Sequence, residues 1–304
     1  MQKILVIGAS GFVGGHLARA LLAQGYEVRC LARSPAKVKD LAALGCEVVQ
    51  GDISDLASLQ SALDSVEAVY ISIHTLSPQH ANTKGQGFMD VEFDGLKNIV
   101  AACQTHGVRR LIYLTSLGIG PKTRSAWTRE RWKAEQFLLG SGLDVTAIQP
   151  GQIVGVGGTG FDMMVNQAKK SVALMFSNGQ QKYRNIAVDD LIYYLVGVLN
   201  DARSFGQCYE VGCDDILSND QMVDLTAELL GRPHPRKIHF PRRLLGALAP
   251  LIERAGKLPK GALKGLLDGM TDDLIGDPTP IRAILPRPPL PYRQAVEQAI
   301  RKDS

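Results

Sequence analysis

The stretch that decides the fold is Lys3-Ile-Leu-Val-Ile-Gly8-Ala-Ser-Gly11-Phe-Val-Gly14, near the start of the 304-residue chain. An apolar run ends in Gly-x-x-Gly-x-x-Gly and a helical apolar pattern follows at once, which is the strand–turn–helix context of a dinucleotide fingerprint. The first glycine permits a tight turn, the second admits a diphosphate, and the third lets helix pack on strand. Because a helix N-terminus offers free N–H groups to an anion, we expect a diphosphate to be held by Gly8, Ser10, Gly11, Phe12 and Val13.

The composition is that of an ordinary globular protein, with 45% hydrophobic and 21% charged residues. No apolar stretch reaches the roughly 18 residues of a membrane span, and the first predicted strand begins too early for a signal peptide. The five cysteines form no CxxC pair and have no histidines at ligand spacing, so we expect reduced thiols, no metal site and a cytoplasmic protein. The net charge of +4 gives no reason to expect nucleic-acid binding.

Strand and helix patterns alternate through the first 150 residues. The strands are short and apolar without alternation, which is typical of buried parallel strands. We therefore predict an α/β, Rossmann-type doubly wound parallel sheet with its ligand at the carboxyl ends of the strands. The predicted strands are 2–7, 27–32, 46–50, 67–73, 109–115 and 144–149, and the predicted helices are 12–24, 35–44, 55–63, 85–106 and 126–141.

The pattern changes after Pro150, so we predict a dinucleotide-binding domain over 1–154 and a smaller lobe over 155–304. This lobe is expected to face a small-molecule substrate and to return some elements to the sheet. Ser218-x-x-Gln221 is a capping box, and Asp189 is expected to cap a helix. The glycine-rich loop 155–160 is expected to close over substrate. The predicted helices are 161–172, 190–200, 219–230, 242–255, 261–269 and 292–301, and the predicted strands are 173–176, 181–188 and 207–211.

Several short motifs follow one another along the chain in a familiar order. They are Gly8-x-x-Gly11-x-x-Gly14, Val28–Arg33, Gly51-Asp52, Leu114-Thr115-Ser116, Pro150-Gly151 and Asn185–Asp190. With these marks the chain resembles the extended and atypical short-chain dehydrogenase/reductases over nearly its whole length. It is most similar to the branch of the NmrA-like proteins and the relatives of a complex I subunit. The resemblance implies NAD(P) binding but specifies no substrate.

The end of the second predicted strand indicates which cofactor is bound. NAD is held there by a carboxylate and NADP by a cation. The only acid within 27–39 is Glu27, at the opposite end of the strand, whereas Arg33 and Lys37 follow its carboxyl end. Because a planar guanidinium suits a phosphate, we expect NADPH rather than NAD. The alternative is that Arg33 and Lys37 are two solvated surface cations.

The resemblance also assigns residues to the two ends of the cofactor. At the adenine end it implies contacts by Asp52 and Ile53, although Asp52 or Ser54 is alternatively a helix cap for 55–63. Ser72 and His74 close the fourth strand and are expected near the ribose and diphosphate, with a purely structural histidine as the alternative. At the other end, the resemblance implies that the nicotinamide is lined by Pro150, Gly151 and Ile153.

The catalytic pattern of the resembled enzymes is incomplete here. They carry a Ser or Thr, a Tyr that exchanges a proton with the substrate, and a Lys four residues later that lowers the tyrosine pKa. Thr115-Ser116 matches the hydroxyl position and Lys133 the lysine, which also contacts the cofactor in these enzymes. Arg129 stands where the tyrosine belongs, and helix 126–141 contains no tyrosine. Some members of the resembled family use an asparagine on the fourth helix, and its position aligns near Glu92 in this chain.

Two functions remain open. The first is an NADPH-dependent oxidoreductase for a small or hydrophobic carbonyl or enone, with Ser116 and Lys133 facing the substrate. The second is a non-catalytic NAD(P)H-binding regulator or assembly factor, which the missing tyrosine favours. Lys133 is alternatively a plain surface lysine, since Arg129 and Arg131 suggest a helix with many exposed charges. Tyr113 and Tyr183 are weak candidates for a replacement acid, and Arg33 argues against an epimerase with tightly held NAD.

A basic segment lies in the C-terminal half. Residues 232–264 contain nine Lys or Arg and one acid, Glu253. Leu244, Leu248 and Leu251 fall on one face of a predicted helix there. A basic amphipathic helix is suited to an anionic membrane surface, so peripheral membrane contact through 242–264 is one hypothesis. We prefer the alternative, a lobe helix that buries its apolar face and leaves its cations in water.

Overall fold

The computed structural model describes residues 2–73, 88–175, 179–240, 242–255 and 272–303. It divides into two compact units that alternate along the chain. The first unit comprises 1–115, 131–149 and 192–209, and the second comprises 116–130, 150–191 and 210–304. The sequence analysis placed a boundary after residue 154 and expected some later elements to return to the sheet; in the structure, 192–209 belongs to the first unit. Within the described residues, no helix combines the length and hydrophobicity needed to cross a bilayer.

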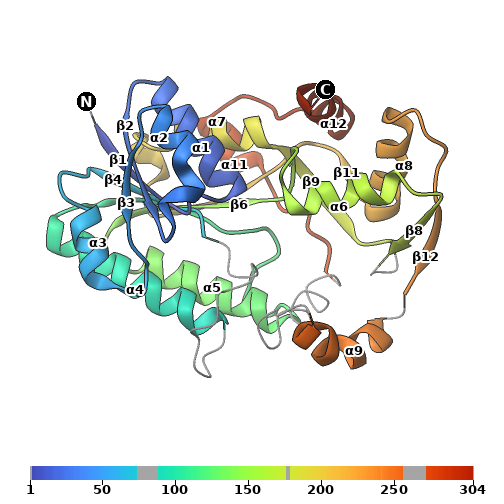
Figure 1. Cartoon of the computed structure of the whole chain (residues 1–304), viewed down its shortest axis with the longest axis horizontal. Helices are drawn as coiled ribbons and strands as arrows, with labels where there is room; N and C mark the ends of the chain where they lie inside the picture. Colours follow the sequence, from blue (N-terminus) through green and yellow to red (C-terminus); the bar gives the residue numbers. More distant parts are fainter. Residues whose placement is uncertain (1, 74–87, 176–178, 241, 256–271, 304) are drawn as a thin grey trace. The chain divides into compact units, whose positions relative to one another are not determined.

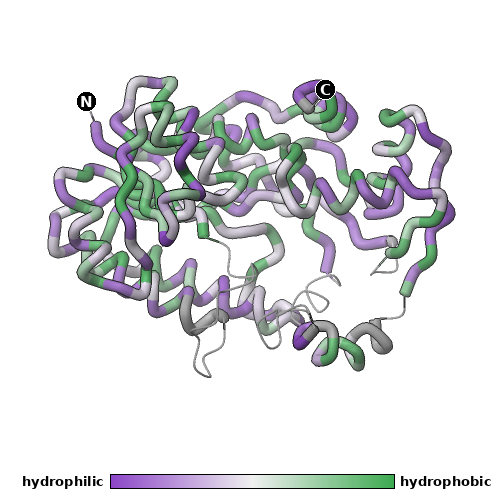
Figure 2. The backbone as a smooth tube through the Cα atoms, viewed as in Figure 1, coloured by the Kyte–Doolittle hydropathy of each residue, from purple (hydrophilic) through white to green (hydrophobic). Residues whose placement is uncertain are grey.

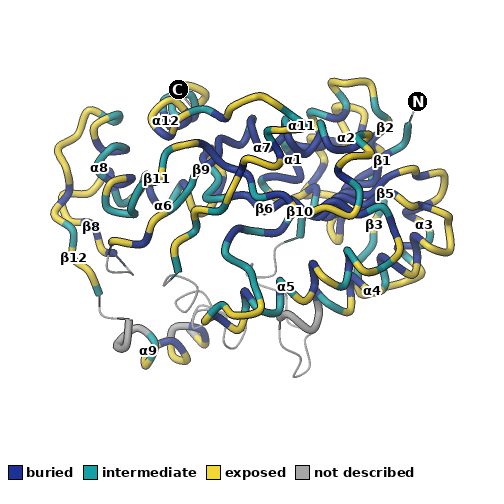
Figure 3. Tube along the Cα trace, turned by 180° about the vertical axis from the view of Figure 1, so that it is seen from behind, coloured by how far each residue is buried: buried dark blue, intermediate teal, exposed yellow. Residues whose placement is uncertain are grey.

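The first unit is built on a seven-stranded sheet with the strand order β10-β6-β5-β4-β1-β2-β3 (Figure 1). Its neighbours from β3 to β6 pair in parallel, which confirms the predicted doubly wound sheet. The central strands are buried, as predicted, and β1, β4, β5 and β6 carry the colour of buried residues in Figure 3, whereas the edge strand β3 contains no buried residue. Their bounds are β1 Lys3–Ile7, β2 Glu27–Ala32, β3 Glu47–Gln50, β4 Ala68–Ile71, β5 Arg110–Leu114, β6 Asp144–Pro150 and β10 Gln207–Val211.

Helices cover both faces of this sheet. Figure 1 shows α1 (Phe12–Ala23) and α2 (Lys39–Ala43) on one side, and α3 (Leu56–Ala62) and α4 (Phe88–His106) on the other. The predicted helix 35–44 begins instead as a 3-10 helix over Pro35–Val38, which α2 follows directly. The core beneath α3 and α4 includes six side chains that are each at most 1% exposed: Leu5, Val69, Leu111, Leu59, Leu96 and Ile99.

Hydrogen bonds from a buried arginine of the sheet hold the segment 192–209 against it. Arg110 of β5 donates from Nε to the carbonyl oxygen of Leu199 (2.7 Å) and from Nη2 to that of Val198 (2.6 Å). These carbonyls follow the end of helix α7 (Val188–Gly197), where a cation is favoured by the helix dipole. The short helix Ala202–Ser204 comes next, and the amide of Gly206 then donates to Val145 of β6 (2.7 Å) and leads into β10.

The second unit contains two small sheets. One has the order β11-β9-β7 and the other pairs β12 with β8 in parallel. The capping box is confirmed, because Ser218 and Gln221 cap each other's backbone at the start of α8. The strands are β7 Gln152–Val154, β8 Val172–Met175, β9 Lys182–Ala187, β11 Ile216–Ser218 and β12 Arg236–His239, and the helices are α6 Thr159–Ala168, α8 Asn219–Leu229, α9 Arg242–Ala255, α11 Thr279–Ile284 and α12 Tyr292–Asp303. The predicted helix 261–269 lies outside the described residues, and α5 (Ala126–Leu139) runs from this unit into the first.

Two carboxylates at the start of α7 bind the C-terminal segment within the second unit. Asp190, 2% exposed, accepts from the amide of Leu290 (2.8 Å) and from Arg287 (2.9 Å). Asp189 accepts from Gln298 and Lys302 of α12 at 2.7 and 2.6 Å. The prediction that Asp189 caps a helix was therefore wrong, because it lies inside the first turn of α7 and its carboxylate binds α12 instead.

Candidate functional site

The glycine turn after β1 has the geometry that a close backbone approach requires. Gly8 has φ +93°, and a Cβ atom added to it would lie 2.1 Å from the carbonyl oxygen of Ser72. A Cβ atom on Gly14 would lie 2.2 Å from the carbonyl oxygen of Gly8. Side chains are therefore excluded at both positions by backbone atoms, which cannot move aside. The amide of Gly11 closes the turn by donating to Gly8 (2.9 Å).

The N-terminus of α1 is arranged to receive an anion. Gly11 is its N-cap residue, no described side chain caps the helix, and its first turn contains no acid. The first N–H groups of a helix have no intrahelical acceptor and carry partial positive charge. A Cβ atom on Gly11 would meet only the carbonyl oxygen of Gly8, at 3.2 Å, among the described atoms. Ser10 and Gly11 are exposed, Phe12 is half-buried and Val13 is buried, so this corner fits a diphosphate.

The residues predicted for the cofactor's adenine end follow β2 and β3. Arg33 directly follows β2 and Lys37 lies in the turn Pro35–Val38, and both side chains are exposed. Glu27, at the opposite end of β2, lies 3.8 Å from Lys3. The end of β2 thus presents cations to solvent, while the contact with a 2′-phosphate stays a prediction.

Asp52 and Ile53 lie in the turn after β3. Asp52 Oδ1 accepts from the amide and the hydroxyl of Ser54 at 2.9 and 2.8 Å. The cap of α3 is Asp55, which accepts from the amide of Ala57 (3.0 Å), so the alternative of a cap by Asp52 or Ser54 was wrong. The side chain of Ile53 lies over α4, where a Cβ atom on Gly95 would be 2.4 Å from its Cδ1.

The end of β4 supports the glycine turn from the side. The amide of Ser72 donates to Ile7 at 2.9 Å, and its carbonyl oxygen is the atom that crowds Gly8. Ser72 is half-buried. His74, the other residue predicted here, lies outside the described residues.

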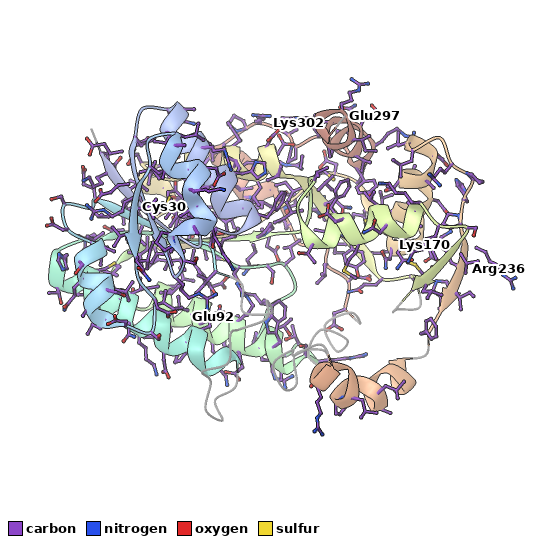
Figure 4. The ribbon with its side chains drawn as sticks, viewed as in Figure 1. Cys30, Glu92, Lys170, Arg236, Glu297 and Lys302 are labelled. Carbon is purple, nitrogen blue, oxygen red and sulfur yellow. The ribbon has the colours of Figure 1, made fainter. Side chains whose placement is uncertain are left out.

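A buried ion pair occupies the carboxyl end of β5. Arg131 of α5 is 1% exposed and Glu92 of α4, labelled in Figure 4, is 0% exposed. Arg131 Nη1 lies 3.2 Å from Glu92 Oε1, and the hydroxyl of Tyr113 donates to the same carboxylate oxygen (3.1 Å). Arg131 also donates from Nε to the Thr115 hydroxyl (3.2 Å) and from Nη2 to the carbonyl oxygen of Leu114 (3.3 Å). The pair joins two helices to the end of the strand.

This pair decides which face of α5 turns inward. Lys133 is exposed, whereas Arg131, Ala134, Glu135 and Leu138 are all buried. The inference that Arg131 is an exposed surface charge was therefore wrong. The cation that reaches the strand end is Arg131, and a site role for Lys133 stays a prediction. The sequence signal for the Glu92–Arg131 pair is an arginine and a glutamate at positions i and i+4 of one helix, Arg131 and Glu135, together with an acid on the preceding helix.

Arg129, four residues before Lys133, does not replace the tyrosine of the resembled enzymes. Its Nη1 donates to the carbonyl oxygens of Thr123 and Arg124 at 2.6 and 2.9 Å. Burial raises the pKa of Tyr113 and of Tyr183 above the ordinary value of a phenol. The hydroxyl of Tyr183 donates to Gln181 (2.6 Å). A raised pKa makes both phenols poor proton donors at neutral pH.

Ser116 and Asn185 are among the residues of the second unit whose buried polar side-chain atoms lack a hydrogen-bond partner in the described part of the chain. The Ser116 hydroxyl is buried and has no hydrogen-bond partner among the described residues. Asn185 of β9 is 1% exposed, and in the described part of the chain neither its amide oxygen nor its amide nitrogen has a partner. Buried polar groups are normally hydrogen-bonded, so such groups mark sites where water or ligand binds. The sequence analysis missed Asn185 as a site residue, although a polar residue in an apolar strand was a usable signal.

Backbone contacts join these two residues through the predicted nicotinamide-lining segment. The amide of Leu117 donates to Pro150 at 3.0 Å, and a Cβ atom on Gly151 would lie 1.8 Å from the carbonyl oxygen of Arg184. In the next register positions Gln152 pairs with Asn185 and Ile153 with Ile186. Thr115 and Ser116 therefore differ in their surroundings. The Thr115 hydroxyl accepts from Arg131 in the first unit, whereas Ser116 belongs to the second unit and its hydroxyl has no partner among the described residues.

Comparison with known proteins agrees with this geometry. A family described as NAD(P)H-binding matches residues 8–199, from the first fingerprint glycine to the segment that returns to the sheet. The chain belongs to the NAD(P)H-binding family. This confirms the expected resemblance and the nucleotide-binding fold.

Relatives within this family differ in the roles their names describe. Sterol demethylase protein B of Methylococcus capsulatus is 29% identical over 279 residues, covering 81% of this chain and 80% of its own. Photosystem II assembly factor Ycf39 of Cyanophora paradoxa is 32% identical over 145 residues, 48% of this chain and 44% of its own. An Escherichia coli quinone oxidoreductase, QOR2, solved with NADPH, superposes with a TM-score of 0.76 at 21% identity over 98% of this chain and 99% of its own. By their printed names, the sequence relatives thus include a demethylase protein and an assembly factor.

Proposed function

We propose that the protein is an NADPH-dependent reductase of a hydrophobic, conjugated carbonyl compound. The observation that carries the proposal is the glycine turn at Gly8–Gly14 of the first unit, which fits a diphosphate, and the unsatisfied Ser116 hydroxyl of the second unit supports it. Gly8, Ser10, Gly11, Phe12 and Val13 would hold the diphosphate, and Arg33 and Lys37 would hold the 2′-phosphate. NADPH supplies a hydride when bound.

Cofactor positioning at the nicotinamide end would fall to backbone and apolar groups. Pro150, Gly151 and Ile153 would border the ring, and Gly151 is held tightly by the carbonyl of Arg184. The Ser116 hydroxyl would donate to the substrate carbonyl oxygen and so hold the acceptor in place. Lys133 is proposed to assist at the ribose or the substrate.

The residues at the end of β5 favour a conjugated substrate. Helix α5 contains no tyrosine, and the cation at the strand end is a guanidinium, which stays protonated and transfers no proton. An isolated carbonyl becomes a strongly basic alkoxide on reduction and requires an acid. An enone or related acceptor delocalises the negative charge and takes its proton from water. The name of the sterol demethylase relative, which refers to a hydrophobic molecule, supports an apolar substrate.

A second candidate function is an NADPH-binding assembly factor without catalysis. The buried Glu92–Arg131 pair favours it, because a neutral, hydrogen-bonded pair at the strand end offers neither an acid nor a base. A relative named as an assembly factor supports it as well. In this function Ser116 and Asn185 would bind ordered water rather than substrate.

Cofactor titration tests the shared part of both candidates. We expect NADPH to quench protein fluorescence at lower concentration than NADH, and Arg33→Ala to weaken NADPH binding about tenfold while leaving NADH binding unchanged, since it removes one charged contact. Arg301→Ala, which removes an exposed arginine of α12, is the matched control. Equal affinity for the two cofactors, unaffected by Arg33→Ala, would refute the NADPH preference.

Turnover distinguishes the two candidates. We expect NADPH oxidation with a panel of enones and quinones and little with saturated ketones of similar size. Ser116→Ala is expected to lower kcat about 100-fold while NADPH affinity is retained, because the hydroxyl acts on the substrate. Tight NADPH binding with no oxidation by any compound of the panel would favour the assembly factor.

A further inference from the structure

Among the described side chains of α9, two leucines face solvent while a glutamate is buried, which is the reverse of an ordinary surface helix. Leu248 is 41% exposed and Leu251 is 67% exposed. The inward positions hold Ala249, at 2%, and Glu253, at 6%. The sequence analysis preferred a helix that buries its leucines, and for these two leucines that expectation was wrong. Figure 2 shows hydrophobic and hydrophilic positions following each other along α9, and Figure 3 shows much of its described surface as exposed.

The charges around this helix are almost all positive. Residues 232–264 contain nine basic residues, and their one acid is Glu253, which is buried in α9. Arg254 at the end of α9 is exposed. The acids of α8 nearest to the segment are already engaged, because Asp224 binds Lys237 (2.6 Å) and Asp220 accepts from His239 (3.0 Å). Among the described residues of this segment, the exposed ionic side chains are therefore the cations Arg232, Arg236 and Arg254.

The ribbon that precedes α9 repeats the same combination. In the parallel pair β8–β12, Leu174 stands opposite Ile238, and Val172 stands opposite Arg236. Paired residues of neighbouring strands point to one face, and on this face Val172 and Leu174 are each 39% exposed and Ile238 is 43% exposed. Lys170 and Arg236, both labelled in Figure 4, are exposed at its margin. Three branched aliphatic side chains of the ribbon are thus exposed to solvent next to cations.

We propose that the exposed faces of α9 and of the β8–β12 ribbon dock on a membrane surface rich in anionic phospholipid. A helix of 14 residues is too short to span the bilayer and suits the interface, where leucines enter the acyl boundary and cations meet headgroup phosphates. Contact with a second copy of this surface would bring like charges together, so charge complementarity favours an anionic partner. Docking would place the protein where hydrophobic substrates are dissolved, but it does not depend on the proposed activity.

Vesicle co-sedimentation of the full chain tests the proposal. We expect the protein to pellet with vesicles of equimolar phosphatidylcholine and phosphatidylglycerol, but not with phosphatidylcholine alone, and to be released by high salt. The double variant Leu248→Ser/Leu251→Ser and the single variant Arg236→Glu are each expected to weaken partitioning at least about tenfold. The matched controls are Leu44→Ser, which changes an equally exposed leucine of the first unit, and Arg301→Glu.

A second measurement detects membrane insertion directly and does not require a variant that fails to bind vesicles. Leu251→Trp places an indole at the most exposed apolar position of α9, and we expect its emission to shift to the blue and to be quenched by brominated acyl chains in anionic vesicles. Failure to pellet with anionic vesicles, or partitioning that the leucine and arginine changes leave intact, would overturn the proposal. A dimer in sedimentation velocity that Leu248→Ser/Leu251→Ser converts to monomer would also overturn it, by assigning this face to a second copy.

Discussion

Neutralising Glu92 is the most informative single change in this structure. Glu92→Gln keeps the size and the hydrogen-bonding oxygen of the side chain but removes the charge that lies 3.2 Å from Arg131. Arg131 is 1% exposed, so no water replaces the lost carboxylate. The guanidinium would keep its contacts with the Thr115 hydroxyl and the Leu114 carbonyl, both neutral dipoles. The buried guanidinium would then lose its ion-pair partner, while the charge of the buried Glu135 still acts on it.

The size of the effect follows from the burial of both partners. Breaking a buried ion pair by removing one partner costs about 3–5 kcal/mol, whereas an exposed pair is worth about 0–1 kcal/mol. Because glutamine retains an acceptor, we expect a loss near the lower limit, about 3 kcal/mol, equivalent to a fall in Tm of about 6–12 °C for a domain of this size. Replacing both partners, as in Glu92→Gln/Arg131→Met, should recover most of the loss, since no charge is left unpaired.

Urea unfolding followed by far-UV circular dichroism measures these differences. Glu67→Gln, which neutralises an exposed glutamate of the same unit, is the control and should stay within about 0.5 kcal/mol of the parent. The reasoning is refuted if Glu92→Gln is as mild as this control. It is also refuted if the effects of Glu92→Gln and Arg131→Met simply add, because a coupled pair must show an interaction energy in a double-mutant cycle.

Three further changes test other contacts. A methyl group on Gly14 would lie 2.2 Å from a backbone carbonyl oxygen, so Gly14→Ala should cost about 3 kcal/mol or more in urea unfolding and abolish NADPH quenching, whereas Gly246→Ala, whose methyl meets nothing, should do neither. Asp190→Ala leaves the amide of Leu290 without its acceptor, and hydrogen exchange at 288–303 should accelerate about tenfold or more. Burial raises the pKa of Glu135, so the folded protein is most stable when this carboxyl is protonated and loses stability as pH rises through the raised pKa. The free energy of unfolding that Glu135→Gln gains over the parent should therefore grow between about pH 4 and pH 7. A pH-independent difference would contradict this.

Much of the first unit could be predicted because its signals are local. Each parallel strand is a short apolar run, and the turn at Gly8–Gly14 follows from steric limits within a few residues. The capping box at Ser218 and Gln221 is likewise complete within one turn of helix. The short strands β7, β11 and β12 were missed, because three or four residues carry too little pattern to show a period.

The sequence by itself determined the strand–turn–helix unit with which the sheet begins, its glycine turn, and the positive charge after β2. Each of these features depends on residues that are neighbours along the chain. Only the tertiary structure decided that Arg131 rather than Lys133 turns inward, because that choice depends on a carboxylate of α4, 39 positions away, and on the end of β5. It also decided that Asp189 binds α12 and that Leu248 and Leu251 of α9 face solvent. The physical reason is burial: a charge taken out of water needs an opposite charge beside it, and only the folded chain establishes which two residues meet.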